Sequence, residues 1–187
     1  IAGLCKDKLP DAIIRVFSSI GISMPGYVIA SGLMIFLAVN LKVLPVNYNK
    51  PGGWVMPMLT LAIYPTSYLT RLTRASILEV MNQDYLRTER AKGMSEFVVV
   101  FIHALKNSLI PVITYLGPLT ASILTGGFVA ESVFSVPGLG RYFVSSISSR
   151  DYTMIMGVTI FYSALIVFMN LICDILYKIV DPRIKLD

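Results

Sequence analysis

The sequence has 187 residues, of which 55% are hydrophobic and only 14% are charged, and its formal net charge is +5. A soluble domain has about 25% charged residues, so this composition argues against an ordinary soluble fold and indicates a protein that folds in lipid. Most of the basic residues lie in loops between apolar runs, where membrane topology explains them better than nucleic-acid binding does. The two cysteines, Cys5 and Cys173, have neither the number nor the spacing of a metal site or a disulfide framework.

Four apolar runs predict membrane spans, at residues 20–41, 54–72, 109–129 and 154–175. The 22 residues of the first run correspond to about 33 Å of helix, and a bilayer core is about 30 Å thick. Residues 1–19 are more polar and predict a surface helix that leads into this span. Pro25 lies near the start of the first span, and the two prolines inside the second span, Pro57 and Pro65, predict a kinked helix. Because the chain starts at Ile1 and not at Met, we expect it to be part of a longer protein.

The central loop, residues 76–108, is the longest charged interruption of the chain. Its charged residues form two i,i+3 pairs of the kind that stabilises a helix, Asp84 with Arg87 and Glu89 with Lys92. Gly93 is expected just past the end of this helix, and Ser95 is expected to cap a second helix. The apolar body of that second helix, FVVVFIHAL, covers nine residues and is too short to cross a bilayer. A helix, a glycine break and a short apolar helix together predict a docking element.

The distribution of basic residues predicts the orientation of the spans. Twelve of the 16 Lys and Arg residues lie at the start of the chain, in the interruption between the second and third spans, and in the tail, whereas four lie in the other loops. By the positive-inside rule, the central loop and both ends of this chain face the cytoplasm. Glu131 follows the third span near the opposite face, and we expect it to cap or pair within its loop and not to bind an ion.

The sequence contains no phosphate-binding loop, no zinc-protease motif, no nucleophile elbow and no cysteine cluster. The single histidine, His103, has no plausible Cys or Ser partner in the sequence, and a structural role is expected for it. We therefore expect that the chain is not an enzyme. Energy for moving a solute has to come from a partner or from an ion gradient.

Several segments closely resemble permeases of ABC importers, in the branch that transports dipeptides, oligopeptides and nickel. They occur in the order of that family and cover nearly the whole chain: RLTRASILEV, DYLRTERAKG, HALKNSLIPV, GGFVAESVFSVPGLGR, SSRDY and NLICDILYKIVDPRIK. The resemblance implies an all-α, polytopic membrane protein with the type I importer permease fold. It also implies that residues 1–187 are the C-terminal part of a single permease domain of six spans, two of which precede Ile1.

In this family the central loop carries the EAA motif and a short coupling helix that sits in a groove of a cytoplasmic ATPase. Arg87, Thr88 and Glu89 occupy the three places of that motif, and Lys106 stands where the general pattern has proline, as is typical of the peptide branch. The coupling residues implied in this way are Arg87, Thr88, Glu89, Ala91, Lys92, Gly93, Met94, Ser95, Glu96 and Leu105. Docking of a solute-binding protein is expected on the outer loops, with Glu131, Pro137, Gly138, Gly140 and Arg141 as candidates.

The resemblance implies a second, similar permease subunit, two ATP-binding subunits that hold ATP and Mg, and an extracytoplasmic solute-binding protein, in a bacterial or archaeal inner or plasma membrane. No cofactor is expected in this chain itself. The leading hypothesis is a permease of an ATP-driven importer of dipeptides or oligopeptides. A nickel or other small-solute permease is the alternative within the family, and an ion-gradient-driven carrier, which would need carboxylates near mid-span, is the alternative outside it.

Overall fold

The computed structural model describes residues 8–124 and 127–180, and every regular element within these ranges is a helix. The predicted all-α class is confirmed. Cys5 and two basic residues of the C-terminal tail, Arg183 and Lys185, lie outside the described residues. The helices form two compact units, each made of separate chain segments: unit 1 comprises Ile1–Ile22 and Thr66–Leu116, and unit 2 comprises Ser23–Pro65 and Gly117–Asp187.

A proline stands within a few residues of each place where the chain passes from one unit to the other. Pro65 is the last residue of a unit 2 segment, and Pro118 is the second residue of the next. Both lie inside helices, Pro65 in α3 (Val55–Met81) and Pro118 in α7 (Ile110–Leu124). Proline lacks a backbone N–H and clashes with the carbonyl four residues earlier, so each helix loses a hydrogen bond at that position.

The predicted first span, residues 20–41, is interrupted in the structure. Helix α1 (Leu9–Ser23) ends before Pro25, whose backbone is extended, and α2 (Gly26–Leu33) begins directly after it. Helix α2 continues into a π-helical segment, η1 (Met34–Asn40). The physical reason is that proline has no N–H to donate and disfavours the helical conformation of the residue before it. Helix α1 also begins well before the predicted span.

By length and apolar composition there are two candidate membrane spans, Ile110–Val133, which includes two residues outside the described ranges, and Tyr152–Ile172. The helices Leu9–Ser23 and Gly26–Asn40 add a third candidate if they are counted as one broken span. Helix α3 contains the predicted second span, but Thr, Tyr and Pro interrupt its apolar residues, and it does not qualify by composition. The arrangement of four spans therefore stays a prediction.

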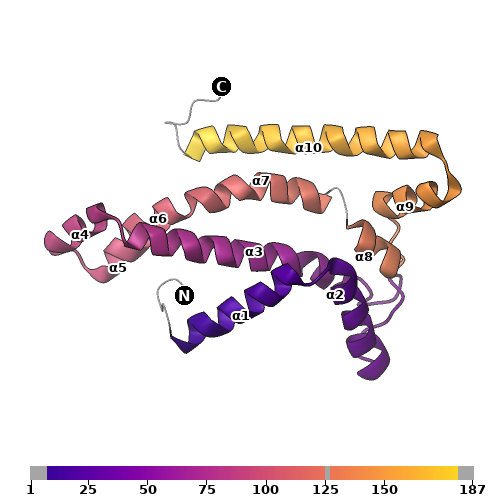
Figure 1. The fold of residues 1–187 in the computed structure, drawn as a ribbon, viewed down its shortest axis with the longest axis horizontal. Helices are drawn as coiled ribbons and strands as arrows, with labels where there is room; N and C mark the ends of the chain where they lie inside the picture. Colours follow the sequence, from indigo (N-terminus) through magenta and orange to yellow (C-terminus); the bar gives the residue numbers. More distant parts are fainter. Residues whose placement is uncertain (1–7, 125–126, 181–187) are drawn as a thin grey trace. The chain divides into compact units, whose positions relative to one another are not determined.

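Unit 1 contains α1, the part of α3 from Thr66 onward, and a group of short helices. These are α4 (Asp84–Ala91), α5 (Glu96–Val98), the π-helical η2 (Val99–Ala104) and α6 (Leu105–Ser108). Figure 1 shows α4, α5 and α6 as short helices that follow the C-terminal end of α3. Buried apolar side chains of these helices and of α3 form one cluster: Val80, Leu86, Val99 and Ala104. This cluster fixes α4 and η2 against the end of α3.

Unit 2 contains α2, η1, the first part of α3, α8 (Phe128–Val133), α9 (Leu139–Ser149) and α10 (Tyr152–Val180). Its buried cluster consists of Ala30, Met56, Ala130 and Phe134, one of which, Phe134, directly follows α8. Small residues at Ala30 and Ala130 let the helix backbones approach closely, and the Phe134 ring fills the remaining space. Much of the apolar surface of α10 stays exposed, as expected for a helix that packs against lipid or other subunits.

Candidate functional site

The break between α4 and α5 is a Schellman motif centred on Gly93. The Gly93 N–H donates to the Arg90 carbonyl at 3.0 Å, and the Met94 N–H donates to the Glu89 carbonyl at 3.4 Å. Gly93 has a φ of +84°, a left-handed conformation that costs an L-residue about 1–2 kcal/mol. A Cβ at this position would meet no atom within 4 Å. Glycine is therefore required by backbone conformation and not by lack of space.

Ion pairs hold the helix before the break and link it to the helix after it. The two predicted pairs are present, with Asp84 and Arg87 3.4 Å apart and Glu89 and Lys92 3.1 Å apart. A third pair was not predicted: the Arg90 Nε lies 2.7 Å from a carboxylate oxygen of Glu96. This pair crosses the Gly93 turn, so it restrains the angle between the two helices.

Ser95 takes the N-cap position of α5 with an extended backbone, but its hydroxyl makes no capping hydrogen bond. The predicted position of the cap is confirmed, and the predicted role of the side chain is wrong. Its backbone carbonyl instead accepts a hydrogen bond from the Val99 N–H at 3.1 Å. The acidic residue in the first turn, Glu96, supplies the negative charge that favours a helix N-terminus, while it also pairs with Arg90.

The helical segment from Glu96 to Ser108 has one face packed on unit 1 and one face free. Val99 and Ala104 are buried in the cluster of unit 1. The hydroxyl of Tyr85 accepts a hydrogen bond from the Asn107 side chain at 2.8 Å and donates to the His103 carbonyl at 3.5 Å. The neighbouring helix α4 is thereby tied to both the middle and the end of this segment.

The free face presents an aromatic pair that the sequence reasoning did not single out. The rings of Phe97 and Phe101 stack with centroids 4.7 Å apart, and Phe97 is 67% exposed. Ile102 is exposed beside Phe101 in the sequence. The i,i+4 spacing of the two phenylalanines in FVVVF is the signal that could have identified this face. Such an apolar helix face suits insertion into a groove of another protein.

The predicted coupling residues lie close together in unit 1, around the Gly93 turn. Every residue from Ala91 to Phe97 is exposed, which makes this turn the accessible tip of the element. Arg87 and Thr88 are exposed on α4, whereas Glu89 is partly buried and its Oε2 has no hydrogen-bond partner. Leu105 is half-buried further along the second helix. We call residues 84–108 the docking element.

The five candidates for docking of a solute-binding protein lie between α8 and the first turn of α9, around the carboxylate of Glu131 in α8. Its Oε2 accepts a hydrogen bond from the Arg141 N–H, in the first turn of α9, at 2.9 Å. A Cβ at Gly138 would overlap this carboxylate, and a Cβ at Gly140 would lie 2.8 Å from the Cα of Phe128. Pro137 is exposed in the same loop. The prediction that Glu131 caps or pairs within its loop is confirmed, and a role of the cluster in docking stays a prediction.

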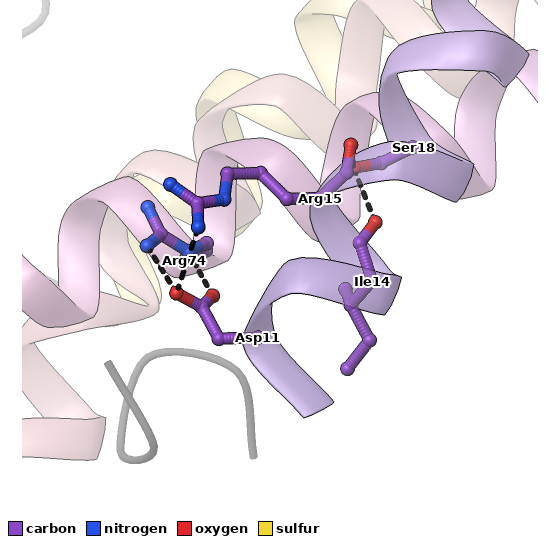
Figure 2. Close-up of polar contacts among 5 residues, drawn as sticks. All are labelled: Asp11, Ile14, Arg15, Ser18 and Arg74. Carbon is purple, nitrogen blue, oxygen red and sulfur yellow. Dashed lines mark hydrogen bonds and ion pairs between the residues drawn. The ribbon is translucent and has the colours of Figure 1, made fainter. Parts of the chain in front are cut away.

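Unit 1 contains a buried ion pair that the sequence did not predict. Arg74 donates two hydrogen bonds to Asp11, from Nε to Oδ1 at 2.5 Å and from an Nη to Oδ2 at 2.7 Å. The Asp11 side chain is 0% exposed, and Arg15 approaches it to 3.8 Å. Figure 2 shows the Asp11 carboxylate pointing from α1 to the Arg74 guanidinium, with Arg15 on the same side. The partners are 63 residues apart, so no local pattern could have revealed them.

The amino-acid sequence matches a known protein family. Residues 1–186 match the model of the binding-protein-dependent transport system inner membrane component. The chain is similar to the dipeptide transport system permease proteins of Bacillus subtilis (47% identity, 100% of this chain and 61% of the relative) and Lactococcus lactis (41%, 97% and 60%). It is also similar to the oligopeptide transport system permease protein of Haemophilus influenzae (38%, 99% and 61%). The chain thus spans about three fifths of the length of these relatives.

Proposed function

Because the chain belongs to the family of binding-protein-dependent transport system inner membrane components, we propose that it is a permease subunit of an ATP-driven importer of dipeptides or oligopeptides. The family is one of membrane transport components and not of enzymes. The relatives named above are permeases of dipeptide and oligopeptide transport, which supports peptides over nickel as the solute. The observation that carries the proposal is the docking element, with its exposed tip and its stacked phenylalanines.

The docking element has the properties that coupling to a moving partner requires. Its second helix offers Phe97 and Phe101 to a groove, while Val99 and Ala104 anchor the other face in the cluster of unit 1. A groove that moves would therefore carry the helix and its anchor with it as a rigid body. In this proposal, ATP binding closes two partner ATPase subunits, the docking element follows them, and the spans change from inward-facing to outward-facing.

The proposal includes the partners and the orientation of the chain. A second permease subunit completes the solute path, two cytoplasmic subunits bind ATP and Mg, and a solute-binding protein delivers the solute from outside. The excess of Lys and Arg around the docking element supports placing it in the cytoplasm, together with both ends of this chain. The loop that contains Glu131 and Arg141 then faces the opposite side, where the binding protein docks.

A cysteine crosslink tests the proposal. Cys5 and Cys173 are replaced by Ser in the complete transporter, and Ser95→Cys is introduced at the exposed tip. We expect Ser95→Cys to crosslink to an ATPase subunit in native membranes, with a yield that changes when ATP is added. Ser149→Cys, at the exposed end of α9, is the matched control and should give no such crosslink. An inserted and folded protein that crosslinks to no ATPase through position 95 contradicts the proposal.

A further inference from the structure

Helix α1 of unit 1 has the inside-out polarity of a helix that faces lipid. Its buried residues are Asp11, Ser18 and Gly21, which lie along one face at spacings of seven and three residues. Its exposed large apolar residues are Leu9, Ile13, Val16, Phe17 and Ile20, and they share the exposed surface with Arg15 and Ser19. A surface helix between protein and water would show the reverse pattern. The sequence predicted a surface helix that leads into the first span, without saying which of its faces is buried, and whether α1 lies at a membrane surface stays a prediction.

The charged residue on the inner face of α1 is held by two parallel hydrogen bonds. The guanidinium of Arg74 meets the Asp11 carboxylate in a fork, at 2.5 and 2.7 Å, and the carboxylate is inaccessible to solvent. Fork geometry fixes the direction as well as the distance between the two side chains. Charged residues inside an apolar environment are costly and occur where they are paired and functional.

Arg74 lies on α3, in the part of that helix that belongs to unit 1 and leads to the docking element. Six residues after Arg74, Val80 enters the buried cluster with Leu86 of α4 and Val99 of η2. The chain of rigid contacts therefore runs from the docking element through the end of α3 to Arg74 and Asp11. Separating Asp11 from Arg74 would break two short hydrogen bonds to a carboxylate that is inaccessible to solvent, so the contact resists opening during a movement.

We propose that Asp11 and Arg74 are a positioning pair for transport: they make α1 move as one body with the docking element. The proposal rests on the proposed function, because it assigns α1 to the part of the permease that follows the ATPases. In this proposal the ion pair stays closed throughout the transport cycle and is not a gate that opens in each cycle. Its contribution is the transmission of movement from the docking element to α1.

The decisive variant removes the Asp11–Arg74 pair without leaving either residue as a single buried charge, and Arg15, which also approaches Asp11, has a 52% exposed side chain. Replacing a buried ion pair by apolar residues of similar size is often neutral for stability, so Asp11→Leu combined with Arg74→Leu should still insert and assemble. In the complete transporter we expect uptake to fall by about tenfold, within the range of measured coupling effects. ATP hydrolysis stimulated by the binding protein should continue. A role limited to stability would lower hydrolysis, uptake and membrane abundance together.

Conservative variants provide a second test that does not depend on the apolar pair. Arg74→Lys keeps the charge and loses the fork, and Asp11→Glu keeps the charge and lengthens the side chain. Exchanging the two residues is not useful, because an arginine at position 11 would face Arg15. We expect both variants to accumulate normally, to hydrolyse ATP and to transport less solute per ATP than the wild type.

The outcomes separate this proposal from the proposed function. The Ser95→Cys crosslink is measured in the same variants and in the protein with Asp11 and Arg74 unchanged. A missing crosslink in the unchanged protein refutes the proposed function. A normal crosslink together with uptake within about twofold of wild type in the Leu–Leu variant refutes the positioning role, because the expected coupling effect is larger. If the Leu–Leu variant does not accumulate, unchanged transport per ATP in Arg74→Lys and Asp11→Glu refutes it.

Discussion

Replacing Gly93 by Asp tests whether the turn between α4 and α5 is needed for coupling. Gly93 has a φ of +84°, where a residue with a Cβ is strained by about 1–2 kcal/mol, and Asp lies toward the low end of that range. Its charge next to the C-terminal end of α4 adds about 0.3–1 kcal/mol through the helix dipole. Together these effects disfavour the turn by about 1–3 kcal/mol, a factor of about 5 to 150 in its population.

The space around Gly93 predicts that the damage remains local. No atom lies within 4 Å of the place that a Cβ would take, so the new side chain overlaps nothing and insertion should be normal. We expect Gly93→Asp to accumulate in the membrane and to lose most peptide uptake. The assay is uptake of a radiolabelled dipeptide or oligopeptide by cells whose permease level is measured in parallel.

Gly93→Asn is the matched control for Gly93→Asp. Asn has nearly the same shape, tolerates the left-handed conformation and carries no charge. Uptake should therefore decrease in the order wild type, Asn, Asp. Uptake in Gly93→Asp equal to that of the wild type, at equal abundance, would refute both the conformational argument and the coupling role of the turn.

The remaining predictions concern unit 2. Glu131→Gln retains an oxygen that can accept the Arg141 N–H, so we expect little loss of uptake, whereas Glu131→Ala leaves that N–H without its acceptor and should destabilise the loop by about 1–3 kcal/mol. Limited proteolysis of the loop in membranes measures the difference, and equal sensitivity of the two variants would contradict it. Phe134→Ala removes a ring that is 1% exposed, and we expect it to lower the free energy of unfolding by about 3–5 kcal/mol. Thermal unfolding of the purified transporter measures this loss, and Phe128→Ala, at a 55% exposed position, is the control. Similar melting temperatures for these two alanine variants would show that the cluster around Phe134 contributes little.

The features that could be predicted from the sequence depend on short separations along the chain. The all-α class follows from long apolar runs, and the ion pairs Asp84–Arg87 and Glu89–Lys92 follow from i,i+3 spacing on one helix. Gly93 could be assigned to the turn because only a residue without a Cβ adopts its conformation at low cost. Glu131 could be assigned to its own loop because a carboxylate near a helix start finds amide N–H groups there.

Two local features differ from what the sequence predicted. The capping role predicted for the Ser95 side chain was wrong: its residue type and position fit an N-cap, but its hydroxyl makes no capping hydrogen bond. Residues 20–41 read as one apolar run, since hydropathy does not register the missing N–H of Pro25 as a break.

The sequence by itself determined the family, the helical class and the local geometry of the Gly93 turn, because each depends on residues that are neighbours or on motifs in a fixed order. Only the tertiary structure decided that Asp11 pairs with Arg74 across 63 residues, and that α1 turns its polar residues inward. The physical reason is that tertiary packing decides which face of a helix is buried and which is exposed. For a chain that exposes many large apolar side chains and buries polar ones such as Asp11 and Ser18, hydrophobicity alone does not distinguish the two faces.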